Sequence, residues 1–252
     1  MSKIKKIPVI TYPGKAGDRQ LQTIFTARQS RDKEVSEKVE KIIDDIREHG
    51  DEALLEYTKK FDGVTLTQKT IRVSREELSQ SASRIKAELK AAINEAAKRI
   101  KTYHKKQVRS GFTIKTREGK LSQIIRPLNR VGVYIPGGKT IYPSSVLMDI
   151  IPAQIAGVKE IVAVTPPRGE LDPGIAYALS ILGIEEIYRC GGSQIVAALA
   201  YGTKTIKRVD KIVGPGNQYV TAAKRLVFGA VDIDSLAGPS EVTILADSSV
   251  SP

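Results

Sequence analysis

The chain of 252 residues contains a single cysteine, Cys190, and only two histidines, His49 and His104. One cysteine excludes a framework of disulfides within the chain. Neither histidine has cysteine, histidine or carboxylate neighbours at the spacing of a zinc site, so a complete His-based metal site within this chain is not expected. Because only two histidines could serve as the base, a Ser-His-Asp or Cys-His triad is not expected either.

Long hydrophobic runs are missing as well. No apolar stretch approaches the roughly 20 residues that a membrane-spanning helix requires. The first 15 residues are basic and contain only a short apolar segment, Ile7–Ile10, which is unlike the core of a secretory signal. Hydrophobic residues make up 41% of the chain and charged residues 27%, as in ordinary soluble globular proteins. We therefore expect a cytoplasmic protein with no membrane partner.

Acidic residues are scarce in the first half of the chain. Residues 1–130 contain 30 lysines and arginines against 17 acidic residues, whereas residues 131–252 contain 10 against 11. The stretch from Lys98 to Arg130 holds 11 basic residues and one acidic residue, Glu118. Such a stretch can bind nucleic acid or another polyanion, but it is more often a solvated helix face and hairpin. Few aromatic residues accompany it and no nucleic-acid motif is present, so we expect no nucleic-acid partner.

The first 63 residues show one clear helical pattern. Residues 1–32 are polar with scattered apolar side chains and are expected to form an extended arm. Apolar residues then recur at helical spacing over Val35–Ile46. Gly50 and Gly63 are placed to end two successive helices.

A short strand, a long helix and a hairpin are expected next. Residues 69–73 are strand-like, and Ser74 with Glu77 forms a capping box. This box opens helical sequence that is expected to run to about Gln107. Alternating apolar and polar residues over 112–125 predict a hairpin.

From Arg130 onward, short β-branched runs alternate with Ala- and Leu-rich helical patterns. Strands are expected at residues 130–135, 160–164, 186–189, 209–213 and 231–233. This alternation predicts an α/β fold, with a mostly parallel sheet and helices on both faces.

Right-handed crossovers place the carboxyl ends of these strands at one edge of the sheet. Four turns reach that edge: residues 136–138, 165–167, 191–192 and 214–217, all rich in glycine or proline. Glycine permits close approach of a ligand to the backbone, and each turn leads into a helix N-terminus. One such turn alone would be an ordinary βα connection, but four together favour a nucleotide or another anionic ligand.

The single residues at this edge are ambiguous on their own. Gly214 and Gly216 begin like a dinucleotide fingerprint, but Tyr219 stands where its third glycine is required. Asn217 is either the N-cap of the following helix or a ligand contact. Gln194 is either a surface helix residue or a ligand contact.

Three further residues have ordinary structural interpretations. Tyr134 is more simply a half-buried strand aromatic than a ligand contact. Cys190 is expected to be a structural thiol, because no base is adjacent to it in sequence. Ser240 precedes a strand-like run, residues 241–245, and could simply cap a turn. The residues alone thus predict a soluble α/β protein with a ligand edge, and they name no reaction.

Longer blocks of sequence carry more information than these single residues. They read RIKTYHKKQ at 99–107, RVGVYIPGG at 130–138, YPSSVLM at 142–148, GGSQ at 191–194, KIVGPGN at 211–217 and IDSLAGPSE at 233–241. In this order they resemble the histidinol dehydrogenase family, from about residue 30 to the end of the chain. Ser193 is a small departure, since the family usually has alanine there.

The resemblance implies a zinc enzyme that is a homodimer at full length. Such an enzyme oxidises L-histidinol to L-histidine in two NAD-dependent steps through a bound aldehyde, at the end of histidine biosynthesis. The resemblance also implies that Tyr134, Gln194 and Asn217 contact NAD and that Ser240 contacts the substrate. The first three of these lie on the sheet edge that the turns single out.

The family continues well past residue 252, so the chain is expected to cover roughly its first three-fifths. The resemblance implies zinc ligands (a glutamine and a histidine after the last strand, then an aspartate and a histidine) that have no counterpart here. The Glu-His pair assigned to acid–base chemistry also has none. We therefore expect no catalytic or metal-ligating residue in this chain, and no catalysis by these 252 residues alone.

The expected architecture has two parts. Residues 131–233 form an incomplete Rossmann-like NAD-binding domain. Residues 1–130 form an N-terminal helical region and the first part of a second, discontinuous α/β domain, to which residues 234–252 return as a truncated strand. Two other functions stay open: a related NAD-dependent dehydrogenase acting on another amino or hydroxy alcohol, and a basic nucleic-acid-binding protein that uses residues 98–130.

Overall fold

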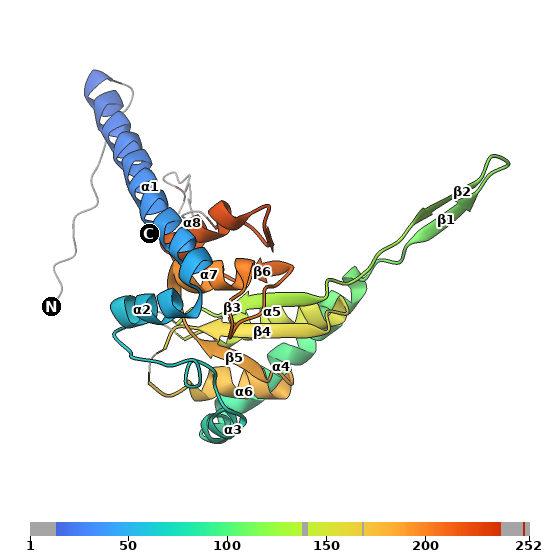
Figure 1. Cartoon of the computed structure of the whole chain (residues 1–252). Helices are drawn as coiled ribbons and strands as arrows, with labels where there is room; N and C mark the ends of the chain where they lie inside the picture. Colours follow the sequence, from blue (N-terminus) through green and yellow to red (C-terminus); the bar gives the residue numbers. More distant parts are fainter. Residues whose placement is uncertain (1–13, 138–140, 168, 238–248, 250–252) are drawn as a thin grey trace.

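The structure is a computed structural model that describes residues 14–137, 141–167, 169–237 and 249 (Figure 1). Its first half consists of helices followed by a hairpin. These elements are α1 (Lys15–His49), α2 (Asp51–Asp62), α3 (Arg75–Ser83), α4 (Ala87–His104), the 3₁₀ turn η1 (Lys105–Gln107), β1 (Phe112–Lys115) and β2 (Lys120–Gln123).

The second half alternates strands and helices, as the sequence predicts. Its elements are β3 (Arg130–Tyr134), α5 (Pro143–Ile155), β4 (Glu160–Thr165), α6 (Pro173–Ile181), β5 (Glu186–Arg189), α7 (Gly192–Tyr201), β6 (Lys211–Val213), α8 (Gln218–Val227) and β7 (Asp232–Ile233). Among the described helices, none combines the length and the apolar composition that a membrane span requires.

The five strands of the second half form one parallel sheet, ordered β5-β4-β3-β6-β7. Strand β3 lies in the middle and pairs with β4 on one side and β6 on the other. The chain therefore moves outward through β4 and β5, then returns past β3 to add β6 and β7. This reversal creates a switch point between β3 and β6, where α/β sheets bind ligands at the carboxyl ends of their strands. The predicted α/β fold with a parallel sheet is confirmed.

Helices cover both faces of this sheet (Figure 1). Helices α7 and α8 lie against one face, and α1 and α2 pack on their outer side. Helices α5 and α6 cover the other face, with α4 packed on α5 and α3 packed on α6. The helices of the first half thus form outer layers on the sheet of the second half.

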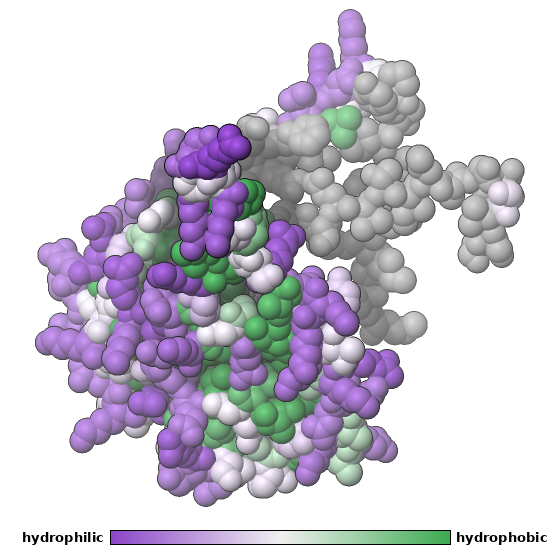
Figure 2. Space-filling view, turned by 90° about the vertical axis from the view of Figure 1, so that its right-hand side faces the viewer, coloured by the Kyte–Doolittle hydropathy of each residue, from purple (hydrophilic) through white to green (hydrophobic). Residues whose placement is uncertain are grey.

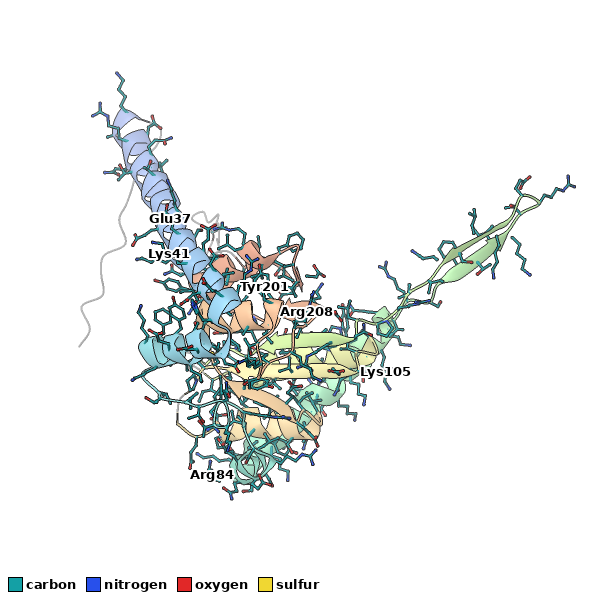
Figure 3. The ribbon with its side chains drawn as sticks, viewed as in Figure 1. Glu37, Lys41, Arg84, Lys105, Tyr201 and Arg208 are labelled. Carbon is teal, nitrogen blue, oxygen red and sulfur yellow. The ribbon has the colours of Figure 1, made fainter. Side chains whose placement is uncertain are left out.

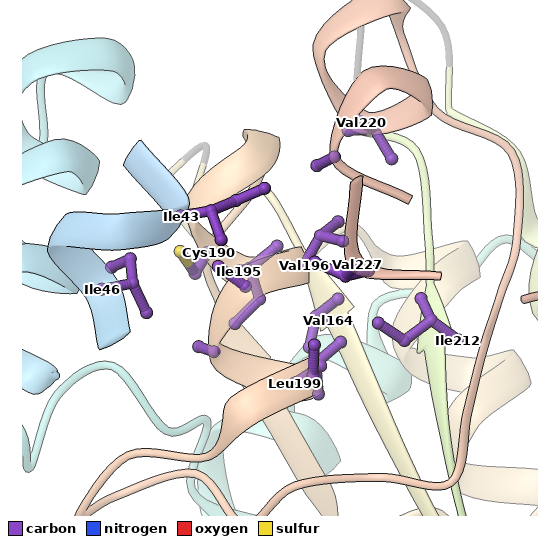
Figure 4. Close-up of a cluster of buried hydrophobic side chains, with 14 of the residues drawn as sticks. Ile43, Ile46, Val164, Cys190, Ile195, Val196, Leu199, Ile212, Val220 and Val227 are labelled. Carbon is purple, nitrogen blue, oxygen red and sulfur yellow. The ribbon is translucent and has the colours of Figure 1, made fainter. Parts of the chain in front are cut away.

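The helical spacing over residues 35–46 explains how α1 joins the core. Ile43 and Ile46 of α1 point into the same apolar cluster as Ile195 and Leu199 of α7 (Figure 4). All four side chains are buried. Gly50 ends α1 with φ of 56°, a left-handed conformation that favours glycine, and the chain turns directly into α2.

Three expectations about the first half are wrong. The extended arm expected over residues 1–32 is helical from Lys15, and residues 1–13 lie outside the described residues. The sequence of α1 contains no proline, and its one glycine is Gly17 near the start. Because the later part of the helix is already anchored by packing, extending it towards the N-terminus costs less than nucleating a new helix. The single helix expected from Ser74 to Gln107 is broken at residues 84–86, because α3 packs on α6 whereas α4 packs on α5.

The third correction concerns the strand expected over residues 69–73. There, Arg72 alone forms an antiparallel bridge, to Tyr188 of β5. The backbone of Val73 donates to Ile187, and that of Arg189 donates to Ile71. This short bridge covers the edge of β5, which would otherwise present unpaired backbone groups.

The predicted hairpin is confirmed, and it projects from the body of the molecule (Figure 1). Every residue of β1 and β2 is exposed, including Phe112, Ile114 and Leu121. On the side from which the hairpin projects, apolar side chains gather between hydrophilic ones (Figure 2). The strand-like run at residues 241–245, and with it the predicted return strand, lies outside the described residues.

Arg130, the first residue of β3, ties three strands together at their amino ends. Its side chain is 8% exposed and contacts Glu160 of β4 at 2.8 Å and Glu186 of β5 at 2.6 Å. The backbone N–H of Arg130 donates to Asp210, just before β6, at 3.0 Å. Arg130, the last basic residue of the 98–130 stretch, is therefore buried and holds strands together, so it does not belong to a charged surface.

We expect Arg130→Ala to lower the free energy of unfolding by about 3 kcal/mol, because it leaves two carboxylates without their shared cation. Urea denaturation of the purified chain measures this. The control is Arg99→Ala, which removes an exposed ion pair with Glu95 within α4 and should change stability little. Equal effects of the two substitutions would contradict the role assigned to Arg130.

Candidate functional site

A cavity of about 800 Å³ opens at the carboxyl edge of the sheet. Its volume is in the range of small-molecule and cofactor pockets. The turns after β3, β4, β5 and β6 all contribute to its wall, and α1, α2 and α8 complete it. The lining residues are Lys38, Lys41, Ile42, Tyr57, Lys60, Phe61, Asp62, Tyr134, Pro136, Gly137, Pro166, Gly192, Ser193, Gln194, Gly216, Asn217 and Tyr219. The ligand edge predicted from the four turns is thus a real concavity.

Tyr134, the last residue of β3, forms part of the cavity wall and is only 3% exposed. Its hydroxyl accepts a hydrogen bond from the backbone N–H of Gly192 at 3.2 Å. Burial raises the pKa of this phenol to about 12. Tyr134 is therefore neutral at physiological pH, and it links the end of β3 to the start of α7.

Gln194 is the most unusual residue of the cavity. It lies in the first turn of α7, it is 1% exposed, and it lines the cavity. Neither Oε1 nor Nε2 has a hydrogen-bond partner of normal geometry among the described residues. The amide does interact with the buried Cys190 thiol, a weak hydrogen-bonding group whose pKa it affects. A buried amide without partners costs free energy, so its retention here points to a ligand that supplies them. The surface position considered from the sequence is wrong, because α1 and α2 cover α7.

Asn217 proves to be the N-cap of α8. Its Oδ1 accepts hydrogen bonds from the backbone N–H groups of Tyr219 at 2.9 Å and Val220 at 3.1 Å. This cap occupies the oxygen only. The residue is exposed and lines the cavity, so its NH₂ group can still donate to a ligand. The structural and the binding interpretations of Asn217 are therefore compatible.

The turn that carries Asn217 is clamped by a buried ion pair. Lys224 of α8, 3% exposed, donates to the carbonyl of Gly214 at 2.8 Å and pairs with Asp234. Asp234 in turn accepts from the N–H of Gly214 at 2.8 Å. Gly214 has φ of 109°, and a Cβ there would lie 2.2 Å from the carbonyl oxygen of Tyr134. Only glycine fits this position, so the clamp and the glycine together set the path of the turn.

The remaining residues singled out from the sequence lie elsewhere. Ser240 is outside the described residues. Cys190 is fully buried beside Thr58, and burial raises the pKa of its thiol to about 12, which is unsuited to a nucleophile. In the described part of the chain, no group of three or more His, Cys, Asp or Glu side chains could hold a metal ion. We assign no chemistry to a metal from these residues.

Asp149 of α5 lies on the other side of the sheet, in a second cavity with Asp234. Its Oδ2 is buried and has no hydrogen-bond partner among the described residues. Burial, and then the charge of Asp234, raises the pKa of Asp149 to about 6, against a smaller opposing effect of Lys224. The sequence does not single out this residue.

Comparisons with known proteins agree with this geometry. The sequence profile described as histidinol dehydrogenase matches residues 26–252. A histidinol dehydrogenase of Bacillus thuringiensis is 54% identical over 215 residues, which are 84% of this chain and 50% of that protein. The histidinol dehydrogenase of Heliobacterium mobile is 46% identical over 249 residues, 98% of this chain and 57% of that protein.

A solved structure supports the same assignment. The crystal structure of histidinol dehydrogenase from Elizabethkingia anophelis superposes with a TM-score of 0.75 and 41% identity, over 92% of this chain and 50% of that one. The chain belongs to the histidinol dehydrogenase family. It spans about half the length of the relatives it matches, slightly less than the three-fifths expected from the sequence.

The position of Lys224 on α8 is a sequence signal for a buried ion pair, which the sequence-based predictions for this histidinol dehydrogenase family member missed. It lies on the apolar stripe of α8 with Val220, Ala223 and Val227, at spacings of three and four residues. A lysine on a buried stripe needs a partner for its charge. The stripe is readable from the sequence, but the partner, Asp234, is known only from the fold.

We expect Asp149→Asn to increase stability relative to the wild type at pH 8 but not at pH 4. The raised pKa means that the folded state resists ionisation of Asp149, so wild-type stability falls as the pH rises from about 4 to above 6. The difference between the two proteins should grow by about 2 kcal/mol over this range. Urea denaturation at several pH values measures it.

Asp232→Asn is the matched control, because hydrogen bonding to Lys211 lowers the pKa of Asp232. Removing that carboxylate should make the variant less stable relative to wild type as the pH rises. A pH-independent difference for Asp149→Asn would show that Asp149 titrates normally.

Proposed function

We propose that the cavity at the carboxyl edge of the sheet binds NAD. The observation that carries this proposal is the buried amide of Gln194, whose donor and acceptor have no hydrogen-bond partner of normal geometry among the described residues. A cofactor in the cavity would supply both. The NH₂ group of Asn217 adds a second donor, and the ring of Tyr134 forms part of the wall. These are the three residues for which the family resemblance implies contacts with NAD.

The backbone around the cavity fits a large ligand with close contacts. The first residue of α7, Gly192, has φ of 67°, and a Cβ there would lie 2.4 Å from Oε1 of Gln194. The turns at Gly137 and Gly216 also bring bare backbone to the wall. NAD, when bound, accepts a hydride from the substrate. The residues described here bind and orient the cofactor.

We further propose that the complete protein oxidises L-histidinol to L-histidine in two NAD-dependent steps, as a zinc-dependent homodimer in the cytoplasm. Family membership supports this proposal, and Ser240 is the proposed substrate contact. Another amino or hydroxy alcohol is the alternative substrate, and a substrate panel on the full-length protein distinguishes the two. In this proposal residues 131–233 form the NAD-binding domain, and residues 1–130 with 234–252 belong to the second domain.

Substitution of the two amides tests the cofactor site. Gln194→Met keeps the side-chain volume but removes the unpartnered polar atoms, so we expect stability to rise by about 1 kcal/mol while NAD binding weakens about tenfold or more. Asn217→Ser keeps an N-cap oxygen but loses the NH₂ donor, so NAD binding should weaken with little change in stability. Calorimetric titration with NAD and urea denaturation give the two readouts.

The outcomes separate binding from folding. Weaker binding with unchanged or higher stability supports a role in recognition. Unchanged NAD affinity in both variants would contradict the site, and so would the absence of saturable binding to the wild-type chain at millimolar NAD.

We expect the 252-residue chain to form no NADH when it is incubated with L-histidinol, NAD and zinc. The reason is that the family's zinc ligands and acid–base pair have no counterpart in its sequence. NADH fluorescence measures the reaction, and a full-length family member serves as the positive control. Turnover by the 252-residue chain would refute this expectation.

A further inference from the structure

We infer that Lys38 and Lys41 of α1 and Lys60 of α2 bind the diphosphate of the dinucleotide. This inference rests on the proposed NAD site and adds to it, because it assigns cofactor binding to the N-terminal helices. Both helices contribute side chains to the lining of the cavity that contains Gln194 and Asn217. Lys41 is labelled on α1 in Figure 3. The phosphate contacts thus come from outside the βα sheet and its turns.

The first observation is the distribution of charge on α1. The part of α1 that contains the cavity residues is net acidic: residues 33–48 hold six acidic and four basic side chains. The side chains of α1 that line the cavity are nonetheless Lys38, Lys41 and Ile42, with no carboxylate. A helix that is merely solvated would present both signs of charge to the cavity.

Helix α2 also presents a lysine to the cavity. This helix carries more acidic than basic residues, yet its cavity face presents Lys60 and a single carboxylate, Asp62. Over the whole lining, three lysines face one aspartate. The cavity wall is therefore net positive, which attracts and holds an anionic ligand.

The lysines are available to a ligand to different degrees. Lys38 pairs with Glu34 within α1, and its pKa is raised by this hydrogen bond and, more weakly, by the phenol of Tyr219. In the described part of the chain, Lys41 and Lys60 have no carboxylate within 4.0 Å. Lys60 instead lies 5.7 Å from the ring centres of Tyr57 and Phe61.

The aromatic pair beside Lys60 favours a nucleotide over a simple anion. Tyr57 and Phe61 stack with ring centres 5.6 Å apart, and both line the cavity. Phe61 is 53% exposed, so it offers an uncovered apolar face next to a cation. A flat base with an attached phosphate matches this combination, since bases stack on aromatic side chains while lysines hold phosphate.

The test compares two double variants of the 252-residue chain. Lys41→Gln with Lys60→Gln removes two cavity lysines. Lys33→Gln with Lys59→Gln removes two lysines from the same helices that do not line the cavity. We expect the first pair to weaken NAD binding about tenfold or more and to reduce its salt dependence, and the control pair to change the affinity less than about twofold. Adenosine, which lacks phosphate, should bind both equally.

Calorimetric titrations with NAD, ADP and adenosine distinguish the outcomes. Equal NAD affinities of the two double variants would overturn the inference while leaving the NAD site intact. If the wild-type chain binds ADP but not NAD, and the cavity variant loses ADP, then the proposed cofactor is wrong and the phosphate site stands. Failure of the wild-type chain to bind either nucleotide would overturn both proposals.

Discussion

The position of β3 determines most of this structure. It is the middle strand of the sheet, all five of its residues are buried, and it pairs in parallel with β4 on one side and β6 on the other. Arg130 holds its amino end to β4, β5 and the residue before β6. Because connections on its two sides cross to opposite faces, α5 and α7 separate, and the carboxyl end of β3 opens into the cavity.

The cavity departs from the ordinary rule that buried polar groups are paired. The amide of Gln194 is buried without a hydrogen-bond partner of normal geometry among the described residues. The turn at Gly214, by contrast, is held in place by contacts with Lys224 and Asp234 and requires glycine because of its positive φ. Rigid turns around an unsatisfied amide are what a preorganised binding site requires, because the ligand then contributes hydrogen bonds without an ordering cost. The same arrangement costs stability in the absence of the ligand.

The first half of the chain has two roles that its composition alone conceals. Its overall positive charge predicts mainly a solvated helix face and hairpin, with a polyanion surface as the alternative, yet the basic residues divide among different places. Arg130 is buried in the sheet, Lys105 lies on the outer side of the molecule (Figure 3), and Lys38, Lys41 and Lys60 line the cavity. The apolar spacing of α1 fixes which of its faces packs on α7 and α8, and this packing directs Lys38 and Lys41 to the cavity. Lys60 reaches it from α2, which packs on α7.

The sequence by itself determined the βα alternation, the parallel sheet and the edge at which its turns meet, because these depend on local periodicity and turn chemistry. It offered the N-cap at Asn217 only as one of two alternatives, which the structure resolves. Only the tertiary structure decided that α1 extends back to Lys15, that the helix after Ser74 breaks at residues 84–86, and that Gln194 is buried. It also decided that Lys224 meets Asp234. The physical reason is that these features depend on contacts between segments distant in sequence, and local propensity does not encode such contacts.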